Sequence, residues 1–235
     1  CVLNGLEVHY NDLDKDITNA FERVISQDRE WIKTLIVSRD EFFKIKEKEN
    51  KATDDFLKLL VNSFGNDKRS YLCSEEISDL KYNIAKEIIE KHDVFNGYKQ
   101  TETYKKATYN AKQENDKRLQ QLERLGQLEQ LQQLNKIKAT NKSYHDFSKV
   151  SGAILYLDPP YEGSNQKGYI NSFDSQEFYD RAFEMAKNNI VIISSYSISD
   201  ERFESVYSFD EARSTLQGGE NSKAKNEKLF MVKNS

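Results

Sequence analysis

Two apolar segments in the second half of the chain constrain its fold more than any other feature. Residues 153–157 (AILYL) and 190–196 (IVIISSY) are short, uncharged and almost wholly apolar. Between them, residues 172–188 have the periodicity of an amphipathic helix, with Ser172 or Asp174 as its N-cap. Continuous apolar strands joined by a helix are typical of parallel sheets covered on both faces. We therefore predict an α/β fold with a doubly wound, mostly parallel sheet.

Further elements are expected on both sides of this strand–helix–strand unit. Residues 6–14 alternate apolar and polar side chains and then turn acidic, as a short strand followed by a turn does. Helical periodicity marks three segments: residues 16–27, residues 56–72 running into a loop at 65–67, and residues 77–92. Two later strands are expected at residues 203–209 and 227–233.

A leucine repeat sets the middle of the chain apart. From Leu119 to Leu134 a leucine recurs at every third position, in a stretch rich in glutamine. An α-helix turns about 100° per residue, so this stripe winds around the helix instead of holding one face. We expect a helical, low-complexity insert within residues 95–143 that adds little to the core, between two portions of one domain at 1–94 and 144–235. Deleting residues 119–136 should then leave the sheet folded.

Composition excludes several classes of protein. No apolar run approaches the roughly 18 residues of a membrane span, so no membrane association is expected. Cys1 and Cys73 have no metal-ligand spacing with the three histidines, which predicts free thiols in a reducing, cytoplasmic compartment and no metal site. Because the chain begins at Cys1 and not at a methionine, we expect it to be a fragment of a longer polypeptide.

Charge is unevenly distributed along the chain. Residues 81–150 contain fourteen Lys and Arg against nine Asp and Glu, a local charge of +5 in a chain of net charge −4. The rest of the chain therefore carries −9. A basic middle attracts phosphates, although solvated helices give the same pattern.

The only two prolines of the chain stand together in the segment DPPY, residues 158–161. Asp158 directly follows the first apolar strand, at the end of a strand where open α/β sheets bind ligands. Pro159 and Pro160 cannot continue the strand and make the turn rigid. A carboxylate, a carbonyl and the ring of Tyr161 then suit a planar ligand with an amino group. The alternative is a strand-ending turn with a surface acid.

These and four other segments resemble one enzyme family. YNDLD (10–14), LVNSFGNDKRSYL (60–72), YHDF (144–147), ILYLDPPYEG (154–163) and IVIISSYS (190–197) occur in the order found in Dam-type, alpha-class DNA adenine-N6 methyltransferases of phages and bacteria. The resemblance implies a class I, Rossmann-like fold that uses S-adenosylmethionine to methylate an adenine flipped out of DNA, as in restriction-modification systems. Asp158 and the Pro159 carbonyl would accept the two N6 hydrogens, and Tyr161 would stack on the base.

The resemblance also implies a cofactor site. Asp12 would bind the ribose hydroxyls, and Asp146 with Phe147 would hold the cofactor adenine. From the residues alone, the alternative for Asp12 is a turn or helix-cap aspartate, and the alternative for Asp146 and Phe147 is a loop acid and a core phenylalanine. At the end of the second apolar strand, Ser194, Ser195 and Tyr196 either wall the target pocket or are ordinary polar strand-end residues.

DNA contacts are expected from the basic middle. Lys105 and Lys106 lie between two tyrosines in TYKKATY, where they could contact phosphates. The alternative interpretation is an exposed basic turn of a helix. Lys68 and Arg69, in NDKRSY, are the next candidates.

One feature of the family is missing. No glycine-rich loop of F-x-G-x-G type occurs in the sequence, so we expect the first strand and its loop to precede Cys1. Two other functions remain open: methylation of another planar amino group (cytosine N4, an RNA base or a glutamine amide), and DNA binding by an inactive fragment.

Overall fold

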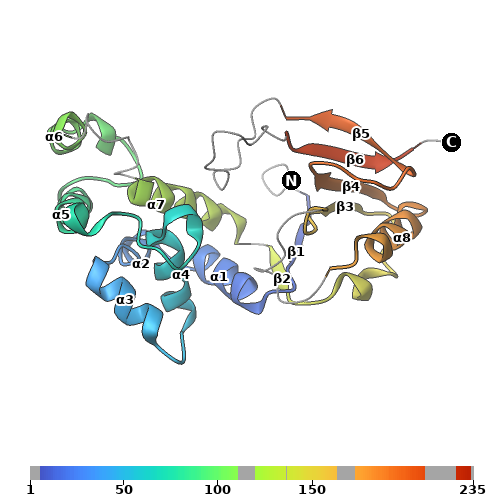
Figure 1. Ribbon diagram of the computed structural model, residues 1–235, viewed down its shortest axis with the longest axis horizontal. Coiled ribbons are helices and arrows are strands. Elements are labelled where there is room, and N and C mark those ends of the chain that lie inside the picture. The colour runs from blue at the N-terminus through green and yellow to red at the C-terminus, as the bar shows by residue number, and fades with distance from the viewer. Residues whose placement is uncertain (1–5, 111–119, 136, 163–172, 210–225, 234–235) are drawn as a thin grey trace. The chain divides into compact units, whose positions relative to one another are not determined.

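The computed structural model describes residues 6–110, 120–135, 137–162, 173–209 and 226–233 (Figure 1). The chain divides into two compact units, Cys1–Asn141 and Lys142–Ser235. The first unit is mostly helical and the second contains a mixed sheet, so the predicted α/β class is confirmed. The segment expected to be an insert, residues 95–143, falls almost entirely within the first unit.

The first unit is a set of helices with a two-stranded sheet. Its helices are α1 (Lys15–Ile25), α2 (Arg29–Lys33), α3 (Arg39–Glu47), α4 (Thr53–Asn62), α5 (Glu75–Lys91), α6 (Glu102–Asn110) and α7 (Gln120–Leu131), with 3₁₀ turns η2 (Phe64–Asn66), η3 (Tyr98–Gln100) and η5 (Gln132–Leu134). Strand β1 (His9–Asn11) pairs in parallel with β2 (Lys138–Thr140). Side chains fix several helix starts: Asp14, Asp28 and Ser38 each accept a hydrogen bond from a backbone N–H in the first turn.

The leucine repeat belongs to the core of the first unit. Leu122 and Leu125 of α7 are fully buried, in one cluster with apolar residues of α1, α4 and α5. Leu128 and Leu131 are half-buried against the same cluster. The expectation that the repeat adds little to the core is therefore wrong. Over four leucines the stripe turns only about 180°, and α7 packs against α1, α2 and α4, so several sides of the helix are covered.

Buried polar side chains fasten α7 to the end of α4. The Asn62 side chain, wholly buried, donates to the carbonyls of Leu35 and Lys58, both at 2.7 Å. Its Oδ1 accepts from Gln121 Nε2 at 2.7 Å. Arg124 donates to the Val61 and Ser63 carbonyls at 2.5 and 2.8 Å. The two bonds from Arg124 satisfy carbonyls at the end of helix α4 that have no intrahelical partners.

The second unit contains the predicted strand–helix–strand unit. Strand β3 (Ile154–Leu157) pairs in parallel with β4 (Ile190–Ser195), with Leu155 opposite Val191. Helix α8 (Ser175–Ala186) lies between them in the chain, and Asp174 caps it by accepting from two backbone N–H groups. A 3₁₀ turn, η6 (Tyr144–Phe147), precedes the sheet. The strands expected at 153–157 and 190–196 are confirmed.

The sheet of the second unit is mixed and not mostly parallel. Its order is β3-β4-β6-β5, and β6 (Lys228–Val232) runs antiparallel to both β4 and β5 (Phe203–Ser208). Helix α8 packs on one face, over Val191 and Ile193 (Figure 1). On the opposite face Ile154 and Tyr156 are 65% and 59% exposed, so the expected cover on both faces is not found among the described residues.

Across the described ranges, no helix is both long and apolar enough to cross a bilayer.

Candidate functional site

The DPPY segment lies where three strands of the second unit meet. Asp158 follows the last residue of β3, and the polar residues Ser194 and Ser195 end the parallel neighbour β4. Strand β6 runs the opposite way, and its first residue pairs with Ser195, so Glu227 lies at this same edge. The carboxyl ends of β3 and β4 thus bring a carboxylate, two hydroxyls and a second carboxylate together.

A chain of hydrogen bonds connects these residues. The hydroxyl of Tyr161 lies 3.1 Å from Ser194 Oγ, and Ser194 Oγ donates to Glu227 Oε1 at 2.6 Å. Ser194 is wholly buried, whereas Tyr161 is half-buried. The ring of Tyr161 packs edge-to-face with that of Tyr196, with centroids 4.7 Å apart. Tyr161 is therefore fixed at both its hydroxyl and its ring.

The environment keeps Tyr161 protonated. Burial is the main cause that raises the pKa of Tyr161 to about 12, and the negative charges of Asp158 and Glu227 raise it further. Asp158 itself is exposed, while Pro159 behind it is buried. The site therefore presents an accessible carboxylate beside a neutral phenol.

The residue after DPPY anchors the turn. Glu162 accepts from the backbone N–H of Ser199 at 2.9 Å and from its hydroxyl at 2.7 Å. Ser199 follows β4, so this contact ties the turn after β3 to the segment after the neighbouring strand. The rigidity expected from two prolines is thus reinforced by a carboxylate.

Two of the proposed cofactor residues lie in the same unit. Asp146 and Phe147 belong to η6, where Asp146 Oδ2 accepts from the Ser143 N–H at 3.1 Å in a capping box. Asp146 is exposed and Phe147 is half-buried. Asp146 therefore already has a structural role in its own turn, in which it caps η6. The cofactor role of Asp146 and Phe147 stays a prediction.

Asp12 lies in the other unit, at the carboxyl end of the parallel strand β1. Its Oδ1 accepts from the Asp14 N–H at 2.8 Å, and the Tyr10 hydroxyl lies 3.4 Å from its Oδ2. Asp12 thus stabilises the turn into α1. Its strand-end position is the one expected of a ribose-binding acid, which also stays a prediction.

Lys68 and Arg69 lie in a tight loop of the first unit. Ser63 and Tyr71 form an antiparallel bridge at its base, and Gly65, Asn66 and Lys68 have positive φ of about 60°. Phe64 in this loop is 48% exposed, although its side chain is large and apolar. The Lys68 ammonium lies 4.4 Å from the centre of the Phe56 ring. The loop therefore combines two cations with an exposed aromatic ring.

Lys105 and Lys106 lie on helix α6, and both are exposed. Lys105 forms an ion pair with Glu102 one turn earlier, at 3.0 Å. Part of the positive charge is therefore compensated locally, as on an ordinary solvated helix.

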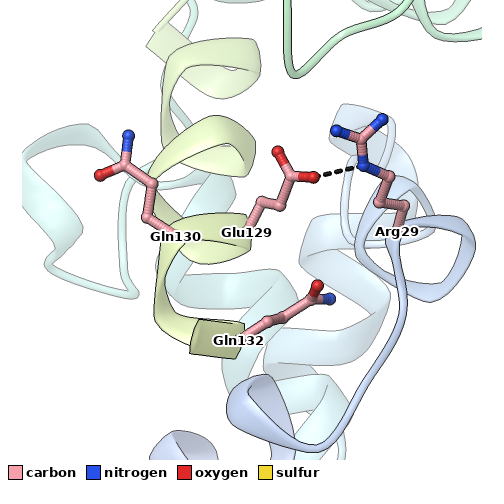
Figure 2. A pocket seen from close by; sticks show the side chains of 4 residues that line it. All are labelled: Arg29, Glu129, Gln130 and Gln132. Carbon is pink, nitrogen blue, oxygen red and sulfur yellow. Dashed lines mark hydrogen bonds and ion pairs between the residues drawn. The ribbon is translucent and has the colours of Figure 1, made fainter. Parts of the chain in front are cut away.

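A surface pocket of about 370 Å³ is lined by Arg29, Glu129, Gln130 and Gln132 (Figure 2). In Figure 2 the Arg29 guanidinium points at Glu129, with which it forms an ion pair, and Asp93 is a second partner. The cation of this pocket is thus neutralised by the chain itself. The pocket adds no chemistry to the strand-end site.

Within the described ranges, no group of three or more His, Cys, Asp or Glu side chains could hold a metal ion. Comparison with models of known protein families gave no match, and no curated protein matched the chain. The residues at the ends of β3 and β4 are therefore the strongest indication of function. Sequence reasoning missed Glu227, which was recognised only as the start of a strand.

Proposed function

We propose that this protein is a DNA adenine-N6 methyltransferase that uses S-adenosylmethionine. The observation that carries the proposal is the DPPY turn at the carboxyl end of β3, beside the polar end of β4. An exposed carboxylate, a carbonyl on a rigid turn and a positioned aromatic ring are what an exocyclic amine on a planar ring needs. The order of the five resembling segments favours adenine over cytosine N4 or a glutamine amide.

The proposed chemistry is one of positioning. The target base must leave the duplex to be reached, and Tyr161 then stacks on it. Asp158 and the Pro159 carbonyl accept the two amino hydrogens, which directs the nitrogen lone pair outward. The proton is lost after transfer, so Asp158 acts as an acceptor and orients the amine.

The residues present fit the nucleoside part of the cofactor. In the second unit, Asp146 is a carboxylate able to accept a hydrogen bond from an amino group, and Phe147 offers a half-buried ring, as the cofactor adenine requires. When bound, the cofactor supplies an electrophilic methyl group on a sulfonium. The chain's own part is to hold the cofactor adenine and to present the amine.

Methyl transfer to duplex oligonucleotides from labelled S-adenosylmethionine tests this function. Asp158→Ala should abolish transfer while cofactor affinity changes by no more than a few-fold, because its acceptor role acts on the base. Asp79→Ala, which removes an exposed carboxylate from α5, is the matched control and should behave as wild type. Transfer near the wild-type rate in Asp158→Ala contradicts the assignment.

For the DNA face, the loop of residues 63–71 is the better candidate than α6. It offers Lys68 and Arg69 beside the exposed ring of Phe64, whereas Lys105 is paired with Glu102. The two pairs of cations allow a matched experiment, in which each pair is replaced by alanine and DNA affinity is measured by anisotropy over a salt series. Each lost phosphate contact lowers the salt slope by about 0.9 on duplex DNA.

We expect the salt slope to decrease by one to two units when Lys68 and Arg69 are replaced. It should change little when Lys105 and Lys106 are replaced. The reverse result moves the DNA face to α6. Normal DNA binding without any methyl transfer by the wild type favours the DNA-binding fragment instead.

A further inference from the structure

The Tyr161 hydroxyl has two hydrogen-bond partners. It interacts with the Asp158 carboxylate, and it lies 3.1 Å from Ser194 Oγ. A phenol has a single proton to donate. The pKa of about 12 means that this proton is retained at neutral pH. Which acceptor receives it decides how much of Asp158 is available to a substrate amine.

The direction of the Tyr161–Ser194 bond follows from Glu227. An ionised carboxylate only accepts, so the single proton of Ser194 Oγ is used in the 2.6 Å bond to Glu227. Ser194 can then only accept from Tyr161. Tyr161 therefore donates to the buried Ser194, and Ser194 donates to the carboxylate of Glu227. We call this chain of two hydrogen bonds the relay. Charge-assisted bonds of this kind are roughly twice as strong as neutral ones, and burial strengthens them further.

We propose that Ser194 and Glu227 are positioning residues that draw the Tyr161 proton away from Asp158 when an amino group donates to that carboxylate. The inference rests on the proposed function, and adds to it two residues that do not touch the substrate. Binding of the amine and rotation of the Tyr161 hydroxyl then occur together, so Asp158 exchanges one donor for another. No proton is transferred and no bond is broken in this step.

Glu227→Gln removes the charge that fixes the direction of the relay, with little change in shape. The amide NH₂ can donate to Ser194 Oγ, which leaves the Ser194 proton to point at Tyr161. The Tyr161 proton is then directed to Asp158, where it competes with the amine. We expect kcat for methyl transfer to fall about tenfold or more, with KM for DNA within about threefold of wild type.

Tyr161→Phe separates this role from a purely structural one. It removes the hydroxyl and keeps the ring, so the relay no longer has a proton to direct. In the Tyr161→Phe background, Glu227→Gln should change kcat less than twofold. An equal loss of kcat in both backgrounds, or wild-type kcat in the single Glu227→Gln variant, overturns the proposal.

A measurement without substrate keeps this test distinct from that of the proposed function. The ¹³Cζ signal of Tyr161, assigned by its absence in Tyr161→Phe, reports whether the phenol donates or accepts. It should move in Glu227→Gln and stay in place in Glu204→Gln, which changes an exposed carboxylate of β5. An unmoved signal in Glu227→Gln refutes the relay even if methyl transfer is observed. A shifted signal with no transfer in the wild type refutes the proposed enzyme and keeps the relay.

Discussion

Replacing Leu125 by alanine tests whether the leucine repeat is part of the core. Leu125 is fully buried, and the change removes three carbons from the cluster that joins α7 to α1, α4 and α5. At about 0.8 kcal/mol per buried methylene, the lost transfer free energy is roughly 2.4 kcal/mol. The cavity left behind raises the expected destabilisation to about 3 kcal/mol. For a unit of this size the melting temperature should fall by about 10 °C.

Trp31 provides a signal specific to the first unit. It is the only tryptophan of the chain and packs against the same cluster. Urea unfolding followed by its fluorescence gives the loss of free energy directly. Leu131→Ala is the control, since Leu131 belongs to the same repeat but is half-buried, and should cost about 1 kcal/mol. A Leu125→Ala protein within 1 kcal/mol of wild type, or no less stable than Leu131→Ala, refutes the packing argument.

Two further predictions concern charged side chains. Arg124→Met should destabilise the first unit by about 1–3 kcal/mol in the same urea assay, because the Val61 and Ser63 carbonyls lose their donor. In the second unit, the hydrogen bond from Arg202 is the main cause that lowers the pKa of Asp200 to about 2. The contribution of ionised Asp200 to the free energy of unfolding is complete above the unfolded pKa near 4 and is lost as pH falls through 2. The free energy of unfolding of the wild type, followed by circular dichroism, should therefore decrease by about 2 kcal/mol over this range. Arg202→Met should not show this decrease.

The strand–helix–strand unit was predictable because its signals are local. The strand at 190–196 is a short uncharged run, and helix α8 begins at a capping aspartate, so each element is specified by its own residues. The parallel pairing of β3 with β4 then follows from the connection through a helix. A strand followed by an acidic turn within residues 6–14 was predictable for the same reason, although β1 begins only at His9.

Elements defined by distant partners were not predictable. Strand β2, Lys138–Thr140, has no apolar run of its own and exists through its pairing with β1, which lies far away in the chain. The burial of Gln121 depends on Asn62 as its partner, and glutamine in a repeat carries no sign of this. The burial of the leucine repeat was not predictable from its periodicity, because α7 is covered by α1, α2 and α4 and not from one side only.

The candidate site also has one part that could be predicted from the sequence and one part that could not. The turn after β3 could be placed at the rim from its prolines and from the preceding apolar run. Glu227 could not be placed there from the sequence, because its position beside Ser194 is set by the antiparallel register of β6, which follows β5 after a long connection. A motif therefore specifies the groups at a strand end, while the register of neighbouring strands decides how those groups are held.

The contacts that hold Tyr161 affect how tightly it would bind a flat ligand. A tyrosine on an unconstrained turn loses rotational freedom when a base stacks on it, and this entropy reduces affinity. Here the ring contacts Tyr196 edge-to-face and the hydroxyl is held by Ser194, so much of that freedom is already lost in the absence of ligand. Because an edge-to-face contact at 4.7 Å between centroids does not cover both faces of either ring, stacking on Tyr161 need not displace Tyr196. The residues around the DPPY turn thus favour a ring that is oriented before the base arrives.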